Sequence, residues 1–243
     1  MSLEIMLIVV LTAAIQSVFG AGVLLIGTPV MLLLGYPFVD VLIVLLPISL
    51  ALNVMKMTKY HAHIDLSLLR KVMLLALPPI AVFLFLVTHV RINIGLIIGP
   101  FLLFIAFKSI LSSVEQILDR LMRYENLYLL TVGMVHGTSN LGGSLLTALV
   151  HHKHYPKDVA RVTIAACYST FAVVQLLTLG LFSRQQIDIP VFGNIIYLLV
   201  ATVIFEVIDS TLFDRIEQDK YRHIFAGFLA FSGLVLITKS LVH

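Results

Sequence analysis

The sequence predicts an all-α membrane protein that crosses the bilayer several times. Of its 243 residues, 60% are hydrophobic and 12% are charged, and the mean hydropathy is +1.05. Soluble domains carry charge on about a quarter of their residues, so this chain lacks the polar side chains that a soluble surface needs. Apolar runs of about 20 residues, the length of a helix that crosses a bilayer, recur along the whole chain.

Eight hydrophobic segments follow one another, four on each side of a charged linker. They cover roughly 4–34, 38–58, 67–89, 92–114, 127–151, 158–183, 189–212 and 222–241. The linker EQILDRLMRYEN, residues 115–126, spaces apolar residues as a helix would, which fits an interfacial amphipathic helix and equally a solvated connector. We therefore predict an N-terminal repeat over 1–114 and a C-terminal repeat over 127–243, joined by this cytoplasmic linker.

Glycines interrupt the first segment of each half. The two interrupted stretches read FGAGVLLIGTP at 19–29 and HGTSNLGGSLL at 136–146. Broken segments in matching positions of two repeats indicate the binding site of a transporter. A helix that begins after such a break presents free N–H groups and the positive end of its dipole, which suits an anion. For Gly20 and Gly22, close packing between helices is an equally good explanation.

The distribution of Lys and Arg predicts how the broken segments lie in the membrane. If all eight segments cross once, the basic residues divide almost evenly between the two sides. If both broken segments return to the side from which they enter, 13 of the 16 Lys and Arg residues fall on one side. Cytoplasmic loops carry the excess of basic residues. We therefore predict two inverted halves, each with a re-entrant hairpin or a pair of short crossings plus three transmembrane helices. Both termini then lie outside the cytoplasm.

The candidate substrate-binding residues are glycines and small polar side chains at the breaks and in the segments that follow them. They are Gly20, Gly22, Asn53, His136, Gly137, Thr138, Ser139, Asn140, Gly142, Gly143, Ser144, Tyr168, Ser169 and Gln175. Neutral donors around two helix ends would form a pocket of positive potential with little fixed charge. Such a pocket suits a small oxyanion that must bind and then leave. Each single polar residue in a transmembrane helix could instead form an interhelical hydrogen bond.

Other polar residues allow further interpretations. The histidines of KYHAH and HHKH have no carboxylate or cysteine at ligand spacing, so we predict no metal site, and nothing indicates another cofactor. Lys56 either reaches into the mouth of the cavity or extends to the lipid headgroups. Glu206 and Asp209 either relay protons or lie at the interface. The expected partners are a small anion, membrane lipid and coupled protons; no nucleic-acid binding is expected.

A channel and a membrane enzyme are the two alternatives to a transporter. A channel is the nearest alternative, but channels use rings of carbonyls or charges, and no such repeat is present. A membrane enzyme is a weaker alternative, because the His and Ser of HGTSN have no orienting carboxylate nearby. We therefore expect no catalytic residues.

The two broken segments resemble those of the TauE/SafE sulfite exporter family (TSUP). In the first, Gly20, Gly22 and Pro29 match the family pattern, whereas Val23 and Leu24 replace later glycines. In the second, HGTSNLGGS, Gly137, Gly142 and Gly143 match, while Asn140 stands at an expected glycine and Ser144 at an expected proline. The runs at 46–66, 157–171 and 214–237 are also similar to the family.

This resemblance extends over nearly the whole chain, and it implies a function. Members are secondary transporters of small sulfur-containing or organic anions, such as sulfite and sulfonates. They move these anions outward across the bacterial inner membrane. The broken segments themselves lead us to expect alternating access, with the anion bound between the helix N-termini of the two opposed hairpins near the bilayer midplane.

Overall fold

The structure, a computed structural model, describes residues 2–19, 22–90, 93–108, 120–182, 191–211 and 218–242. Every regular element in these ranges is a helix, which confirms the predicted all-α class. The helices are α1 (Leu3–Phe19), α2 (Val23–Leu33), α3 (Phe38–Tyr60), the short η1 (His61–His63), α4 (Leu66–Leu75), α5 (Leu77–His89), α6 (Ile94–Lys108), α8 (Glu125–Ser139), α9 (Gly143–His152), α10 (Lys157–Phe182), α11 (Val191–Thr211) and α12 (Gln218–Val242). Residues 115–119 of the linker predicted over 115–126 lie outside the described residues.

These helices correspond to the eight predicted segments, and the two glycine-broken segments are each divided into two helices. The pair α1 and α2 meets at Gly22, and the pair α8 and α9 meets at residues 140–142. The third segment, predicted as one helix, is also divided, at Ala76. Pro78 and Pro79 follow this point, and their missing N–H groups interrupt the helical hydrogen bonds. This break was not predicted.

The helices have the lengths and apolar surfaces of a membrane protein. Four helical stretches of the described chain are long and apolar enough to cross a bilayer: Phe38–Lys59, Leu66–His89, Lys157–Phe182 and Phe192–Asp209. Shorter apolar helices accompany them. On α11, large apolar side chains at helical spacing are exposed, namely Phe192, Ile195, Leu199, Val203 and Val207. An exposed apolar stripe of this kind suits contact with lipid, and the protein is a polytopic membrane protein.

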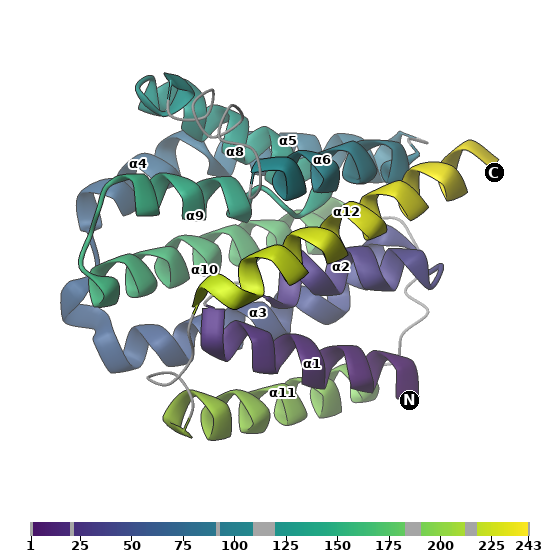
Figure 1. The fold of residues 1–243 in the computed structure, drawn as a ribbon, viewed down its shortest axis with the longest axis horizontal. Helices are drawn as coiled ribbons and strands as arrows, with labels where there is room; N and C mark the ends of the chain where they lie inside the picture. Colours follow the sequence, from purple (N-terminus) through teal and green to yellow (C-terminus); the bar gives the residue numbers. More distant parts are fainter. Residues whose placement is uncertain are drawn as a thin grey trace.

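The packing of the helices is reciprocal between the two halves of the chain. Helices α3 and α10 pack together in the middle of the molecule, and α6 packs against α12 (Figure 1). Helix α1 of the first half packs against α11 of the second, and α8 of the second half packs against α5 of the first. The first helix of each hairpin, α1 or α8, therefore packs against the third segment of the other half, α11 or α5.

The turns after α3 and α9, both rich in basic residues, lie at one end of the molecule, and the two termini lie at the other. In Figure 1, α1 begins and α12 ends on the right, while the turns after α3 and α9 lie on the left. Glu125, at the start of α8, joins two of the basic connections, because it accepts from Lys71 at 3.0 Å and from Lys153 at 2.7 Å. Three of the four connections that the charge count places on one side of the membrane thus meet in the described part of the fold.

Candidate functional site

The first break places the N-terminus of α2 against the end of α1. Gln16, near the end of α1, turns its side chain across the break, and its Oε1 accepts from the amide N–H of Val23 at 2.9 Å. Gly22 lies so close to α1 that an added Cβ would stand 2.7 Å from the amide nitrogen of Gln16 and 2.9 Å from the carbonyl oxygen of Thr12. Glycine is therefore required here by the close approach of two backbones.

A small cavity lies beside this break. Its volume is about 10 Å³, room for about one water molecule, and it is lined by Gln16, Gly22, Leu24, Leu25, Ser49, Asn53 and Tyr168. The side chain of Asn53 is fixed on both sides, because Oδ1 accepts from Nε2 of Gln16 at 3.4 Å and Nδ2 donates to Oγ of Ser49 at 3.3 Å. These three polar residues are buried. The structure thus brings together the predicted residues Gly22, Asn53 and Tyr168.

Tyr168 connects this cavity to the second break. Its ring lines the cavity, and the start of α9 packs against the same ring so tightly that a Cβ on Gly143 would overlap the phenol. The ring of His136 in α8 lies edge-on to it, with 6.5 Å between the centroids. One side chain of α10 therefore contacts elements of both broken segments.

The second break turns at Asn140. Its backbone has φ +63°, in the left-handed region that Gly and Asn adopt most easily, and its N–H donates to the carbonyl of His136 at 2.8 Å. The side-chain Nδ2 donates to Oγ1 of Thr28, in α2, at 3.0 Å. The left-handed turn explains why Asn replaces the expected glycine here.

A buried pair of polar side chains lies next to this turn. Nε2 of His136 donates to Oε1 of Gln175, in α10, at 3.0 Å, and the imidazole packs on the ring of Phe171. Three of the buried side-chain atoms that lack a hydrogen-bond partner in the described part of the chain lie here: Nδ1 of His136, Nε2 of Gln175 and Oδ1 of Asn140. Buried polar atoms are normally paired, so these three mark a second polar group.

The remaining predicted residues serve local structure. The hydroxyls of Thr138, Ser139, Ser144 and Ser169 donate to carbonyl oxygens three or four residues earlier in the chain, at 2.6 to 3.0 Å. Gly137 fits against α5, where an added Cβ would stand 2.6 Å from the carbonyl oxygen of Ile80, and Gly142 fits against α8. Gly20 lies outside the described residues. The glycines of the second break are thus in close contact with protein atoms.

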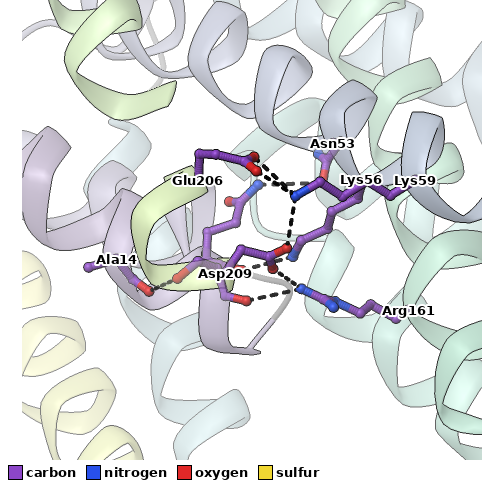
Figure 2. Close-up of polar contacts among 9 residues, drawn as sticks. Ala14, Asn53, Lys56, Lys59, Arg161, Glu206 and Asp209 are labelled. Carbon is purple, nitrogen blue, oxygen red and sulfur yellow. Dashed lines mark hydrogen bonds and ion pairs between the residues drawn. The ribbon is translucent and has the colours of Figure 1, made fainter. Parts of the chain in front are cut away.

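A charged cluster beside the first break was not among the predicted site residues. Lys56 follows Asn53 by one helical turn and is only 1% exposed, so it does not extend to headgroups. Arg161 forms an ion pair with Asp209, and Lys59 contacts Glu206 at 2.8 Å and Asp209 at 3.6 Å (Figure 2).

The sequence pattern did mark two residues beside the first break, Gln16 and Lys56, as unusual. Gln16 is a polar residue in an apolar helix one turn before the glycine break, and Lys56 is a charge one turn after a candidate amide. The length of the Lys side chain allows both a buried and an interfacial position, so the sequence left the position of Lys56 open.

The basic end of the molecule holds a separate cluster around Asp65. This residue caps α4 by accepting from the amides of Ser67 at 2.8 Å and Leu68 at 3.0 Å, and Tyr155 donates to its other oxygen. Burial alone would raise the pKa of Asp65. The hydrogen bonds from Tyr155 and the two amides, with the charge of Lys153, outweigh it and hold the pKa below its ordinary value.

The same end holds Glu125 with its two lysines. Burial alone would raise the pKa of Glu125, but the hydrogen bonds and charges of Lys153 and Lys71 outweigh it, so the pKa is lowered. Charge-assisted bonds of this kind favour the ionised carboxylate. Asp65 and Glu125 therefore stabilise this end of the molecule in their charged forms.

Buried helix breaks that adjoin a polar cavity, within a bundle of apolar helices, define a membrane transporter as the class of protein. The profile of the family described as Sulfite exporter TauE/SafE matches residues 5–236, and the chain belongs to this family. Membership implies an anion transporter of the sulfite-exporter type. No curated protein and no solved structure shows significant similarity to the chain.

Proposed function

We propose that the protein exports small sulfur-containing or organic anions, such as sulfite or sulfonates, across the bacterial inner membrane. Membership of the TauE/SafE family supports the chemical class of the cargo. The observation that carries the site is the buried polar cavity at the N-terminus of α2, which Gly22, Asn53 and Tyr168 line. A transporter of this kind needs no catalytic residues.

The chemistry of the cavity favours an anion. The amide of Val23 and the positive end of the α2 dipole face the break, and the polar lining consists of side-chain amides and hydroxyls. None of the described residues that line the cavity is acidic. Oε1 of Gln16, bound to the Val23 amide, stands where an oxygen of the anion would accept the same hydrogen bond. The residues of the second break, with Asn140 at their centre, would complete the binding site when the hairpins move.

The proposed mechanism is alternating access between two inverted repeats, 1–114 and 127–243. The reciprocal packing of α1 on α11 and of α8 on α5 supports a two-fold relation between the halves. Rocking of one half against the other would open the cavity to either side in turn. The basic turns after α3 and α9 lie at the end opposite the termini, which supports termini outside the cytoplasm.

Protons are the proposed coupling ion, and His136 is the group that supports this role. Its Nε2–H donates to Gln175, so Nδ1 keeps a lone pair that is buried and unpartnered within the described chain. A solvated imidazole takes up and releases protons near neutral pH, so His136 would be protonated in a state in which water reaches Nδ1. His136→Gln should therefore make anion flux in liposomes independent of an imposed pH gradient. A variant that still responds to the gradient as the wild type does would contradict this role.

Binding and flux of defined anions test the proposed function. In detergent, sulfite or isethionate should raise the melting temperature of the wild type and of Asn93→Ala, an exposed control. Asn53→Ala, which removes the fixed amide of the cavity, should lose most of this shift. In liposomes, counterflow of labelled anion is expected from a carrier. Flux without counterflow would indicate a channel instead, and no response to any anion would refute the proposal.

A further inference from the structure

Lys56 is a buried cation within a membrane-spanning helix. Its side chain is 1% exposed, and Nζ has two described contacts: the main-chain carbonyl oxygen of Gln16 at 2.9 Å, and the ring of Phe205, whose centroid lies 5.1 Å away. Burying an ammonium group is costly unless an opposite charge accompanies it. An ionisable side chain at such a place marks a functional site by default.

The carboxylates near Lys56 are bound to other cations. Asp209 pairs with Arg161 and contacts Lys59, while Glu206 accepts two hydrogen bonds from Lys59 (Figure 2). Within the described residues, no carboxylate oxygen lies within 4 Å of Nζ of Lys56. The carbonyl at the end of α1 and the face of Phe205 offer only partial negative charge.

Gln16 connects this ammonium group directly to the cavity. Its carbonyl oxygen accepts from Lys56, its side-chain Oε1 accepts from the first amide of α2, and its Nε2 donates to Asn53. Lys56 and Asn53 lie one turn apart on the same face of α3. A ligand that displaces the Gln16 side chain would therefore reach the α2 amide, Asn53 and the neighbourhood of Lys56 together.

We propose that Lys56 is the counter-charge of the transported anion, and that the side chain of Gln16 occupies the anion's position when none is bound. The anion replaces Oε1 of Gln16 at the Val23 amide, and Nζ of Lys56 turns from the Gln16 carbonyl to the anion. One ammonium group compensates one negative charge, so the preferred cargo is a monoanion, such as hydrogen sulfite or a sulfonate. This inference rests on the proposed function and adds the charge of the cargo to it.

The first test compares two anions on the wild-type protein. Isethionate is a singly charged sulfonate, and sulfate is a doubly charged oxyanion of similar chemistry. Isethionate should bind at least about tenfold more tightly than sulfate, measured by titrated thermal shift or calorimetry in detergent, because a second negative charge would stay uncompensated in a buried site. Equal binding, or tighter binding of sulfate, would overturn the inference.

The second test removes the charge. Lys56→Met should weaken isethionate binding by about tenfold or more, yet leave the melting temperature without ligand unchanged or raised, since a buried charge is replaced by an apolar side chain. Lys71→Met, which removes a lysine from the distant Glu125 cluster, is the matched control and should bind like the wild type. If Lys56→Met keeps wild-type affinity, or binds weakly only because the protein unfolds, Lys56 is structural and the inference fails.

The third test places a fixed carboxylate at the proposed anion position. Gln16→Glu should pair internally with Lys56, raise the melting temperature and abolish the isethionate-induced shift. Unchanged isethionate binding in this variant would contradict the role of Gln16. The outcomes separate the two proposals: a wild type that binds no anion refutes the proposed function itself. A wild type that binds isethionate with no dependence on Lys56 refutes only this inference.

Discussion

Asn140 and Thr28 are joined by a side-chain hydrogen bond of 3.0 Å across 112 residues of sequence. Asn140 forms the second break and Thr28 lies in α2, so the bond ties the two broken hairpins to each other. Both residues are buried, where a lost hydrogen bond is not replaced by water. The bond is therefore a fixed contact between the elements that we expect to move during transport.

Asn140→Ala and Asn140→Gly together separate the two roles of Asn140. Alanine loses the side-chain bond and also strains the left-handed backbone, each at about 1 kcal/mol. Glycine loses the bond but fits the backbone. We expect the free energy of unfolding in detergent to fall by about 2 kcal/mol in the alanine variant and by about half of that in the glycine variant. Equal losses in the two variants would show that the left-handed backbone contributes nothing.

Gly143→Ala should be strongly destabilising because the new methyl group would overlap the phenol of Tyr168. Overpacking of this kind costs about 1–3 kcal/mol. Gly180→Ala, in α10, is the matched control, since nothing lies within 4 Å of its position; it should be neutral or slightly stabilising. The double variant with Tyr168→Ala should regain part of the stability lost in Gly143→Ala. No recovery in this variant would show that the clash lies elsewhere.

Asp209→Asn should destabilise the protein much more than Glu206→Gln. The side chain of Asp209 is 5% exposed and serves both Arg161 and Lys59, whereas that of Glu206 is 49% exposed. Breaking a buried ion pair costs about 3–5 kcal/mol, and an exposed pair contributes about 0–1 kcal/mol. Chemical denaturation in detergent measures the difference. Similar losses in the two variants would mean that this cluster is solvated throughout.

Acid should weaken the end of the molecule that Asp65 and Glu125 hold together. Their pKa values are lower in the folded protein than the ordinary values of 3.8 and 4.5. Their stabilising contribution is therefore complete above these ordinary values and is lost as the pH falls below them. The melting temperature should be steady near neutral pH and fall below about pH 4.5.

Tyr155→Phe tests how much the hydrogen bond from Tyr155 to Asp65 contributes to this pH dependence. Without the Tyr155 hydroxyl, the pKa of Asp65 moves toward its ordinary value. The variant should therefore be less stable than the wild type at neutral pH but lose less stability on acidification. Tyr124→Phe, at an exposed position, is the control and should follow the wild type. Parallel pH profiles for Tyr155→Phe and the wild type would contradict the role of this bond.

Much of the fold was predictable because membrane helices are specified by composition. Apolar runs separated by short polar turns gave the segments, and the glycines located the two hairpins. The bend at Ala76 was missed, since the following prolines lie inside an uninterrupted apolar run and proline is tolerated in membrane helices. Which helices pack against one another could not be predicted either, because lipid-facing and buried positions are occupied by the same apolar residue types.

The candidate site was predicted in part. Asn53, Tyr168 and Gly22 line one cavity, and their shared signal was a polar or glycine position within an apolar segment. His136, Asn140 and Gln175 form a separate buried group, a division that depends on how the hairpins pack. Gln16 and Lys56 were not included because their side chains act through contacts between helices distant in sequence. Single polar residues therefore identify candidates, whereas packing decides which of them meet.

The two hairpins differ in when their partner helices are synthesised. When α8 emerges from the ribosome, its partner α5 is already made, but α1 must wait for α11, which begins at residue 191. Until then, the face of α1 that packs on α11 has no protein partner, although Gln16 can already contact α2 and α3. We expect nascent chains that end before α11 to remain bound to the insertion machinery and to be degraded when released. Stable, protease-resistant accumulation of such truncated chains in pulse-chase labelling would disprove this order of assembly.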